Sequence, residues 1–424
     1  MQLILKTIFE AMIFRLVYQV VTVIGYPILR ILGVFSKKLR LFVLGRDMVF
    51  DQLRTREVDR GKWVWFHVAS LGEFEQARPI MKEYKKSFPH QKLLLTFFSP
   101  SGYEVQKDFD QADCVCYLPW DSPKNVNLFL DFCKIEKAFF VKYEFWPNYL
   151  EGLSKRGIAV FSVCSIFRTH QLFFKSYGKA YRNILFGIKH FFVQNEESKS
   201  LLQSIGINQV TVSGDSRVDR VFELTQNQKP EAVVATFVGA QNCFVAGSIW
   251  PSDQKLLNSF LLQSSSIKII LVPHEVSQKS IQKLEKTMTL PYCKWSNYDH
   301  KRDQNKKIMI VDTIGKLTKI YHNATFAYVG GGMKKNGLHN TLEPATYGIP
   351  VIIGKYYRRF QEAEFLVKSG GIRSVDHADG FLKLAQQLLS DPQLVKKMGR
   401  INTAYIKASI GASQKIIQTI KIDY

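Results

Sequence analysis

Three charged residues of this sequence are of the types that carry proton transfer and anion stabilisation. Glu73 stands in "HVASLGEFEQA" after an apolar run that breaks at Gly72, Glu144 lies in "VKYEFWPN", and Arg217 lies in "VSGDSRVDR". A helix dipole keeps a carboxylate in the first turn ionised, and an ionised carboxylate can take a proton from a hydroxyl. An arginine can neutralise a leaving phosphate. This combination favours a group transfer that needs a base and a cation.

Each of these residues also has a purely structural interpretation. Glu73 could cap its own helix, Glu144 could be another first-turn charge, and Arg217 could be an exposed side chain paired with Asp215 or Asp219. Spacing alone does not choose between the two interpretations. Two carboxylates that follow two strands of one sheet favour a site, because the carboxyl ends of parallel strands meet at one edge.

Further candidates stand at junctions between apolar runs and helices, where free backbone amides can hold phosphate. One junction is "LVPHEV" at 271–276, and another is "VDTIGKL" at 311–317. The run "YVGGGMKKNGLHNTLEPATYGIPVIIG" has three consecutive glycines, which let a backbone approach a nucleotide closely. Asn340 and Glu343 within it fit an N-cap box, and Glu343 fits a grip on ribose hydroxyls equally well. His274 fits a helix cap or solvent exposure as well as a ligand contact.

Short apolar runs alternate with amphipathic segments from Trp63 onward, which predicts an α/β protein with mostly parallel sheets and crossover helices. The first series of predicted strands is "WVWFHVAS", "KLLLTFF", "CVCYLP", "KAFFVKY", "IAVFSVC", "HFFVQN" and "QVTVSG". The pattern weakens at 224–240. A second series follows with "CFVAGS", "IKIILVP", "KIMIVD", "TFAYVG" and "IPVIIG". The prediction is two tandem doubly wound domains that bind ligands at the carboxyl ends of their strands.

The composition indicates an anionic partner. The net charge is +22 in 424 residues, which fits phosphorylated substrates or an acidic lipid surface. No nucleic-acid-binding motif is recognisable, so we expect no nucleic-acid partner. The six cysteines form no CxxC pair and no zinc-type spacing, so we expect reduced, buried thiols and no metal site.

The amino-terminal 45 residues are apolar but carry Lys6, Glu10, Arg15 and Arg30. About fourteen uncharged residues between Leu16 and Leu29 are fewer than the roughly 20 that a spanning helix needs. The basic residues that follow suit an anionic cytoplasmic leaflet: Lys37, Lys38, Arg40 and Arg46. We therefore expect a retained membrane anchor that either spans the bilayer or lies in its interface. A helix docked on its own domain is the alternative.

The ordered motifs "HVASLGEFEQA", "YEFWPN", "VQNEES", "VSGDSRVD", "LVPHE", "DTIGKL" and "GLHNTLEPATYGIPVIIG" resemble the family of 3-deoxy-D-manno-octulosonic acid (Kdo) transferases. The resemblance runs from the apolar amino terminus to about residue 410. It implies the GT-B architecture of two Rossmann-like domains, and inverting transfer from CMP-Kdo to a lipid A precursor without metal or cofactor. It also implies an anionic inner-membrane surface as a partner and a location on the cytoplasmic face of the inner membrane.

The resemblance assigns roles to the candidate residues. It implies that Glu73 is the general base, and that Glu144 and Arg217 stabilise the transition state. It implies contacts to CMP from Pro273, His274, Ile314, Gly315, Lys316, Asn340, Thr341, Leu342 and Glu343. On this basis we predict an anchor at 1–45, an acceptor domain at 46–225 and a donor domain at 226–424.

Three positions depart from the family pattern: His274 replaces an arginine, Lys316 a glutamate and Lys142 a second acidic residue. A neutral imidazole holds phosphate less firmly than a guanidinium does, and Arg358 or Arg359 is our candidate to compensate. Two other functions remain open at this point. One is a GT-B enzyme that uses a UDP-sugar, and the other is a non-catalytic nucleotide-binding protein at the membrane.

Overall fold

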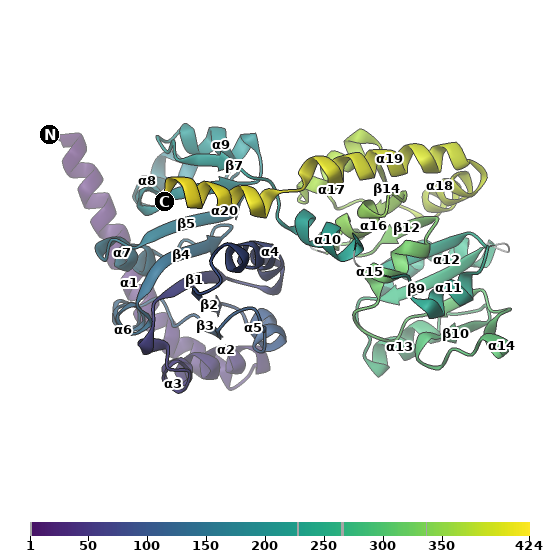
Figure 1. Cartoon of the computed structure of the whole chain (residues 1–424), viewed down its shortest axis with the longest axis horizontal. Helices are drawn as coiled ribbons and strands as arrows, with labels where there is room; N and C mark the ends of the chain where they lie inside the picture. Colours follow the sequence, from purple (N-terminus) through teal and green to yellow (C-terminus); the bar gives the residue numbers. More distant parts are fainter. Residues whose placement is uncertain (1, 227–228, 264–266, 336) are drawn as a thin grey trace. The chain divides into compact units, whose positions relative to one another are not determined.

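The computed structural model describes residues 2–226, 229–263, 267–335 and 337–424. The chain forms two compact units (Figure 1). Unit 1 comprises the residues up to Arg220 together with Gly411–Tyr424, and unit 2 comprises Val221–Ile410.

Unit 1 contains a parallel sheet in the order β3-β2-β1-β4-β5-β6-β7. All seven predicted strands of the first series are confirmed. Their bounds are β1 Trp63–Val68, β2 Lys92–Phe97, β3 Cys114–Tyr117, β4 Ile135–Val141, β5 Ala159–Ser165, β6 His190–Val193 and β7 Val210–Val212. The strand order reverses between β1 and β4, which is where doubly wound sheets bind their ligands.

Helices cover both faces of this sheet. Up to β4 they are α1 Gln2–Gly33, α2 Lys37–Asp47, α3 Val49–Thr55, η1 Val58–Arg60, α4 Leu71–Ser87, α5 Pro100–Gln106 and α6 Pro123–Cys133. After β4 they are α7 Pro147–Lys155, η2 Leu172–Phe174, η3 Ser176–Gly178, α8 Lys179–Arg182, η4 Asn183–Gly187 and α9 Glu196–Gln203, with α20 Ala412–Asp423 at the chain end. Helix α10 Arg217–Gln226 begins in unit 1 and continues into unit 2.

Alternate side chains of β1 enter two different cores. Trp63 and Trp65 belong to one core cluster, and Val64 and Phe66 belong to the other. All four side chains are at most 2% exposed. This strand is apolar on both faces because each face is covered by helices, as in other parallel sheets.

The last helix differs from our predicted boundary, which placed residues 226–424 in one domain. Helix α20, the yellow helix at the C label in Figure 1, belongs to unit 1. Its apolar face packs Ile416, Ile417 and Ile420 into the core cluster that contains Phe66. This burial of three branched side chains explains why the helix returns to the first sheet.

Unit 2 contains a second parallel sheet in the order β10-β11-β9-β8-β12-β13-β14. Its strands are β8 Cys243–Ile249, β9 Lys268–Pro273, β10 Tyr292–Lys294, β11 Ile308–Ile310, β12 Phe326–Val329, β13 Val351–Gly354 and β14 Ile372–Val375. The five strands predicted for the second series are confirmed. The two edge strands β10 and β14 were not predicted, because they are short and only partly buried.

The helices of unit 2 complete the doubly wound fold. They are α11 Ala232–Val238, α12 Pro251–Gln263, α13 Gln278–Glu285, η5 Trp295–Asn297, α14 His300–Asp303, α15 Leu317–Ile320, η6 Tyr321–Asn323, α16 Leu342–Thr346, α17 Gln361–Ser369, α18 Ala378–Ser390 and α19 Pro392–Ser409. All six cysteines of the chain are free, and the expected burial of their thiols is confirmed.

Helix α1 is long, and its side chains from Met12 onward are mostly exposed. Its segment Met12–Gly33 has a mean hydropathy of 1.6 and is the one candidate membrane span among the described residues. The neighbouring basic segment differs in one respect from our expectation of a membrane-facing patch. Arg46 is 4% exposed, donates to the carbonyl of Phe98 and lies 3.6 Å from the ring centroid of Phe42. Arg46 therefore has a structural role.

Candidate active site

The carboxyl ends of β1 and β4 hold the first group of candidate residues. These strands are neighbours, with His67 of β1 opposite Phe140 of β4. Glu73 lies in the first turn of α4 after β1, and Glu144 follows β4 by three residues. The reversal of strand order therefore brings the two predicted carboxylates to one edge of unit 1.

Glu73 does cap its own helix. Its Oε2 accepts a hydrogen bond of 2.5 Å from the amide of Ala69, and the amide of Ser70 also stabilises the carboxylate. The Ser70 side chain makes no capping bond, so Glu73 takes over that task at this helix start. The residue is 7% exposed. The structural interpretation is thus confirmed, and a catalytic role has to be combined with this capping contact.

The protonation of Glu73 differs from our expectation that the helix dipole would keep it ionised. Burial and the negative charge of Glu144 raise the pKa of Glu73 to about 7. The positive charge of Lys142 and the amides of Ala69 and Ser70 oppose this shift. Desolvation outweighs the dipole here. Near neutral pH the carboxyl group therefore exchanges readily between its two forms, as a general base requires.

A chain of buried polar groups leads to Glu144. The indole of Trp65 donates to Thr96 Oγ1 at 2.7 Å, and Thr96 Oγ1 lies 2.8 Å from His67 Nδ1. On the other side of the ring, the Trp146 indole donates to Glu144 Oε2 at 3.0 Å and to His67 Nε2 at 3.2 Å. These contacts fix the orientation of the Glu144 carboxylate, so the charge that acts on Glu73 is held in place.

Lys142, which the sequence marked only as a departure from the family pattern, acts on the charge of Glu73. Its φ of 60° lies in the left-handed region, which is uncommon for residues other than glycine. The hydroxyls of Ser162 and Ser165 both donate to its carbonyl, which stabilises this turn. Lys142 therefore supplies a cation close to Glu73, at a position where the family pattern expects an acid.

Arg217 is partly buried and paired within its own loop. Its Nε and Nη2 donate to Asp215 Oδ2 at 2.9 and 2.5 Å, while Gln76 donates to Asp215 Oδ1 at 3.2 Å. Burial would raise the pKa of Asp215, but Arg217 and Gln76 together hold it below its usual value. Gln76 stands one turn after Glu73 on α4. The structure therefore joins Arg217 to the helix that carries the predicted base, through the ion pair considered in the structural interpretation.

The reversal of strand order in unit 2 lies between β8 and β12. Three groups donate to the Asp253 carboxylate there: the Tyr328 hydroxyl at 2.8 Å, the Gly331 amide at 3.0 Å and the Trp250 amide at 2.8 Å. Asp253 thus ties the glycine run to the loop after β8. Gly331 has a φ of 89°, and a Cβ there would collide with the carbonyl of Gly337. Glycine is required at this position by the fold itself.

His274 lies in a stack of three rings at this edge. The rings of Trp250 and His339 have their centroids 4.4 and 4.3 Å from that of His274, and Trp250 Nε1 donates to His339 Nε2 at 3.0 Å. Burial lowers the pKa of His274, and burial together with His274 lowers that of His339 to about 4. Both rings are therefore neutral near pH 7. A cavity of about 460 Å³ is lined by Trp250, His339, Lys334, Gly331, Gly337 and Phe360, among others.

Glu343 is bound by residues in or next to the other two predicted segments of unit 2. Thr318 stands two residues after Lys316, and its hydroxyl donates to Glu343 Oε2 at 2.8 Å. Asn340 Nδ2 donates to Glu343 Oε1 at 3.2 Å. Asn340 Oδ1 also accepts from the Leu342 amide at 3.1 Å, so a local capping contact is present. The structure therefore brings Thr318, which follows the predicted segment 314–316, together with 340–343. Within them Ile314 is 83% exposed and Thr341 is buried.

Lys316 is engaged by the protein itself. Its Nζ lies 3.1 Å from Glu231 Oε1 and 5.6 Å from the ring centroid of Trp295. Pro273 ends β9, directly before the ring stack.

Arg358 and Arg359, the residues considered as a replacement for the missing arginine, are exposed and stand next to Phe360, which lines the cavity. Among the described residues, no cluster of His, Cys, Asp or Glu fits a metal ion.

Comparisons with known proteins show which family model and which proteins the chain resembles. Residues 45–220 match the family model described as 3-deoxy-D-manno-octulosonic-acid transferase (kdotransferase). The chain is 29% identical to a 3-deoxy-D-manno-octulosonic acid transferase of Aquifex aeolicus, with 78% of this chain and 88% of that protein covered. It is 26% identical to a bifunctional glycosyltransferase/methyltransferase of Fusobacterium nucleatum over 83% of this chain, and it spans 56% of the length of that relative.

The fold also matches solved structures of low sequence identity. A putative UDP-N-acetylglucosamine 2-epimerase from Listeria monocytogenes has a TM-score of 0.60 at 11% identity, over 85% of this chain and 95% of that one. At this identity the match shows the fold alone, which is GT-B. The family model and the related transferases add information beyond the fold, because they relate the chain to glycosyltransferases. Residues 45–220 thus match the Kdo transferase family model, and most of the chain is similar to transferases that carry this name.

Proposed function

We propose that this protein transfers Kdo from CMP-Kdo to a lipid A precursor, with inversion at the anomeric carbon. The single observation that carries the proposal is the buried Glu73 carboxyl group, whose pKa of about 7 suits a base that works near neutral pH. The similarity to Kdo transferases supports the choice of Kdo as the transferred sugar. Donor contacts come from unit 2 and acid–base chemistry from unit 1.

In the proposed reaction, Glu73 accepts the proton of an acceptor hydroxyl while the hydroxyl oxygen bonds to the anomeric carbon of Kdo. The bond from that carbon to the phosphate oxygen of CMP breaks at the same time, and CMP leaves with the electron pair. Glu144 and Arg217 stabilise the charges of the transition state, and Lys142 stabilises the ionised form of Glu73. The reaction needs neither a cofactor nor a metal.

We assign donor binding to Pro273, His274, Ile314, Gly315, Lys316, Asn340, Thr341, Leu342 and Glu343, with Trp250 and His339 added from the structure. The neutral ring stack offers a flat aromatic face of the kind on which a nucleotide base can stack. Glu343, held by Thr318 and Asn340, suits contacts to ribose hydroxyls. The neutral rings and Glu343 do not neutralise the phosphate of CMP, so we assign that role to cationic groups such as Arg358 or Arg359.

We also propose that α1 attaches the protein to the cytoplasmic face of the inner membrane by lying along the interface. Arg15 pairs with Glu151 and Arg30 pairs with Asp47, each at 2.6 Å. These arginines are fifteen residues apart, roughly 22 Å along a helix, and both partners belong to unit 1. Helix α1 is therefore held along the globular unit, and a span across the bilayer would have to break these pairs. Its exposed side is apolar, as interfacial helices require.

An assay with CMP-Kdo and a lipid A precursor tests the reaction. We expect mass spectrometry to find the acceptor heavier by one or more Kdo residues, and no product with UDP-sugars. Turnover of a UDP-sugar with none of CMP-Kdo would contradict the proposal.

Alkaline carbonate treatment of membranes tests the attachment of α1. A protein that is attached by an interfacial helix is released, whereas retention of the protein in the membrane pellet would indicate a span.

A further inference from the structure

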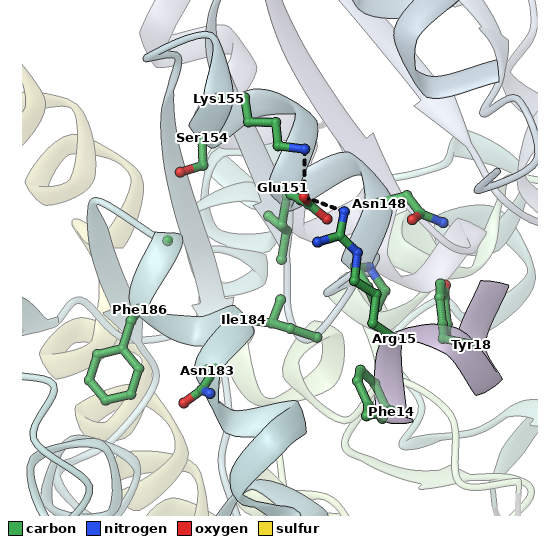
Figure 2. A pocket seen from close by; sticks show the side chains of 13 residues that line it. Phe14, Arg15, Tyr18, Asn148, Glu151, Ser154, Lys155, Asn183, Ile184 and Phe186 are labelled. Atoms are coloured by element: carbon green, nitrogen blue, oxygen red, sulfur yellow. Dashed lines mark hydrogen bonds and ion pairs between the residues drawn. The ribbon is translucent and has the colours of Figure 1, made fainter. Parts of the chain in front are cut away.

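A second cavity lies in unit 1, and Glu73, Glu144 and Arg217 are not among the residues that line it. It has a volume of about 420 Å³ and is bounded by α1, α7 and η4. This volume is within the range of roughly 300–1,000 Å³ that small-molecule sites occupy. Figure 2 shows Phe14 and Ile184 on its walls, with Phe186 at one side. Leu150 of α7 completes the apolar lining and is buried.

The polar part of this cavity carries an excess of positive charge. Arg15 of α1 and Lys155 of α7 both bind the same oxygen, Glu151 Oε1, at 2.6 and 2.7 Å (Figure 2). One carboxylate thus serves two cations. Both cationic side chains are more than half exposed, so each keeps donors for an incoming anion. Phosphate is the anion that suits paired lysine and arginine donors.

The surroundings of the cavity are apolar and exposed. Along α1 the exposed apolar side chains are Met12, Ile13, Leu16, Val17, Val20, Val21, Val23, Ile24, Ile28, Ile31 and Leu32. On the segment before and within η4 they are Leu172, Tyr177 and Phe186. Helix α1 contacts this segment through Phe14, whose ring packs edge-on against Tyr181. The cavity therefore opens within an apolar surface that is suited to lipid.

We propose that this cavity binds one anionic phospholipid of the bilayer, a role that rests on the proposed attachment of α1 to the membrane. The phosphate group lies at Arg15 and Lys155, and an acyl chain lies along Phe14, Ile184 and Phe186. Charge complementarity selects the head group, and the apolar walls hold the chain. The bound lipid fixes α1 against α7, which begins three residues after Glu144.

Native mass spectrometry of the full chain in detergent tests this site, with phosphatidylglycerol and phosphatidylcholine supplied in equal amounts. We expect the wild-type chain to retain one phosphatidylglycerol. The double variant Arg15→Gln with Lys155→Gln removes the cations and should weaken retention about tenfold, as expected for the loss of charge-assisted hydrogen bonds. Glu151→Gln should strengthen retention, because it frees both cations for the phosphate.

Two further variants separate the site from general effects. Arg54→Gln removes an exposed arginine paired with Asp51 elsewhere on unit 1 and should retain phosphatidylglycerol as the wild type does. Ile184→Trp fills the cavity and should abolish retention. If that variant does not fold, the charge variants still decide the question, because they change exposed side chains.

Equal retention of the two lipids, or unchanged retention after both cations are removed, would overturn the assignment. Displacement of phosphatidylglycerol by an equimolar lipid A precursor would also overturn it, because the cavity would then belong to the acceptor. Lipid retention is measured without donor or acceptor, and Kdo transfer is measured separately in detergent without phospholipid. Failure of this site is therefore distinguishable from failure of the proposed reaction.

Discussion

The two sheets reverse their strand order at equivalent places but present different chemistry there. In unit 1 the edge at β1 and β4 carries Glu73, Glu144 and Lys142, three charges that act on one another in a buried setting. In unit 2 the edge at β8 and β12 carries neutral rings and glycines. One fold thus builds one edge suited to moving a proton and another suited to holding a flat ligand.

This comparison explains how the shared topology is adapted. The loops after the strands, rather than the strands themselves, decide what each edge does. In unit 1 a buried carboxylate replaces a serine cap at the start of α4. In unit 2 a buried carboxylate, Asp253, is used only to bind amides and a hydroxyl. Variants at the two edges should therefore affect different kinetic constants.

The largest expected effect comes from Glu73→Gln. Without the base, kcat for Kdo transfer should fall by about 100-fold or more, whereas the Kd for CMP-Kdo should change little. Glu83→Gln, on the same helix and paired only at the surface with Lys86, is the matched control and should leave kcat unchanged. Full activity of Glu73→Gln in a properly folded chain would reduce Glu73 to a helix cap.

The neighbours of Glu73 should shift its titration in opposite directions. Glu144→Gln removes a negative charge that raises the pKa of Glu73, so the rising part of the pH–rate profile should move to lower pH. Lys142→Met removes a positive charge that lowers this pKa, so the rise should move to higher pH. We expect kcat to fall about tenfold in Glu144→Gln, as for lost electrostatic stabilisation. Shifts in the same direction for both variants would show that charge does not couple these groups.

In unit 2, Trp250→Ala should change donor binding more than chemistry. Loss of the stacked ring should raise KM for CMP-Kdo about tenfold, the size expected for one base–aromatic contact, with kcat nearly unchanged. Trp250→Phe keeps an aromatic face and should restore most of the affinity. A large fall in kcat with unchanged KM would contradict the division of roles between the two edges.

The smallest effect is expected from replacing both Arg358 and Arg359 by alanine. If these residues compensate for the neutral His274, KM for CMP-Kdo should rise about threefold to tenfold, because a phosphate contact is lost. Kinetics at two salt concentrations check this, since charge contacts weaken with salt. An unchanged KM would end the compensation hypothesis.

Much of the fold was predictable because periodicity reports burial. Twelve strands were predicted as runs of apolar residues, since strands covered on both faces are apolar throughout. Strands β10 and β14 were missed because edge strands bury less and carry a weaker pattern. The return of α20 to unit 1 was missed because an amphipathic helix shows that it has a buried face but not which sheet covers it.

The candidate site was predictable only in part. Glu73, Glu144 and the segment with Asn340 follow strands in a doubly wound fold, so their edge could be inferred. The pKa of Glu73 could not, because desolvation depends on neighbours that only the folded chain provides. The left-handed turn at Lys142 and the stacking of Trp250 on His274 also depend on three-dimensional packing. Arg46 was predicted to be part of a basic segment that faces the membrane, but the structure buries its side chain. The sequence does not distinguish this arginine from its exposed basic neighbours.

The pH dependence of kcat tests the central claim most directly. Transfer should be measured at saturating CMP-Kdo and lipid A precursor from about pH 5.5 to 8.5. Because burial and Glu144 raise the pKa of Glu73 to about 7, the base form increases as the pH rises, and kcat should rise through about pH 7 to a plateau. A rate that stays constant over this range, or falls with rising pH, would contradict Glu73 as the base.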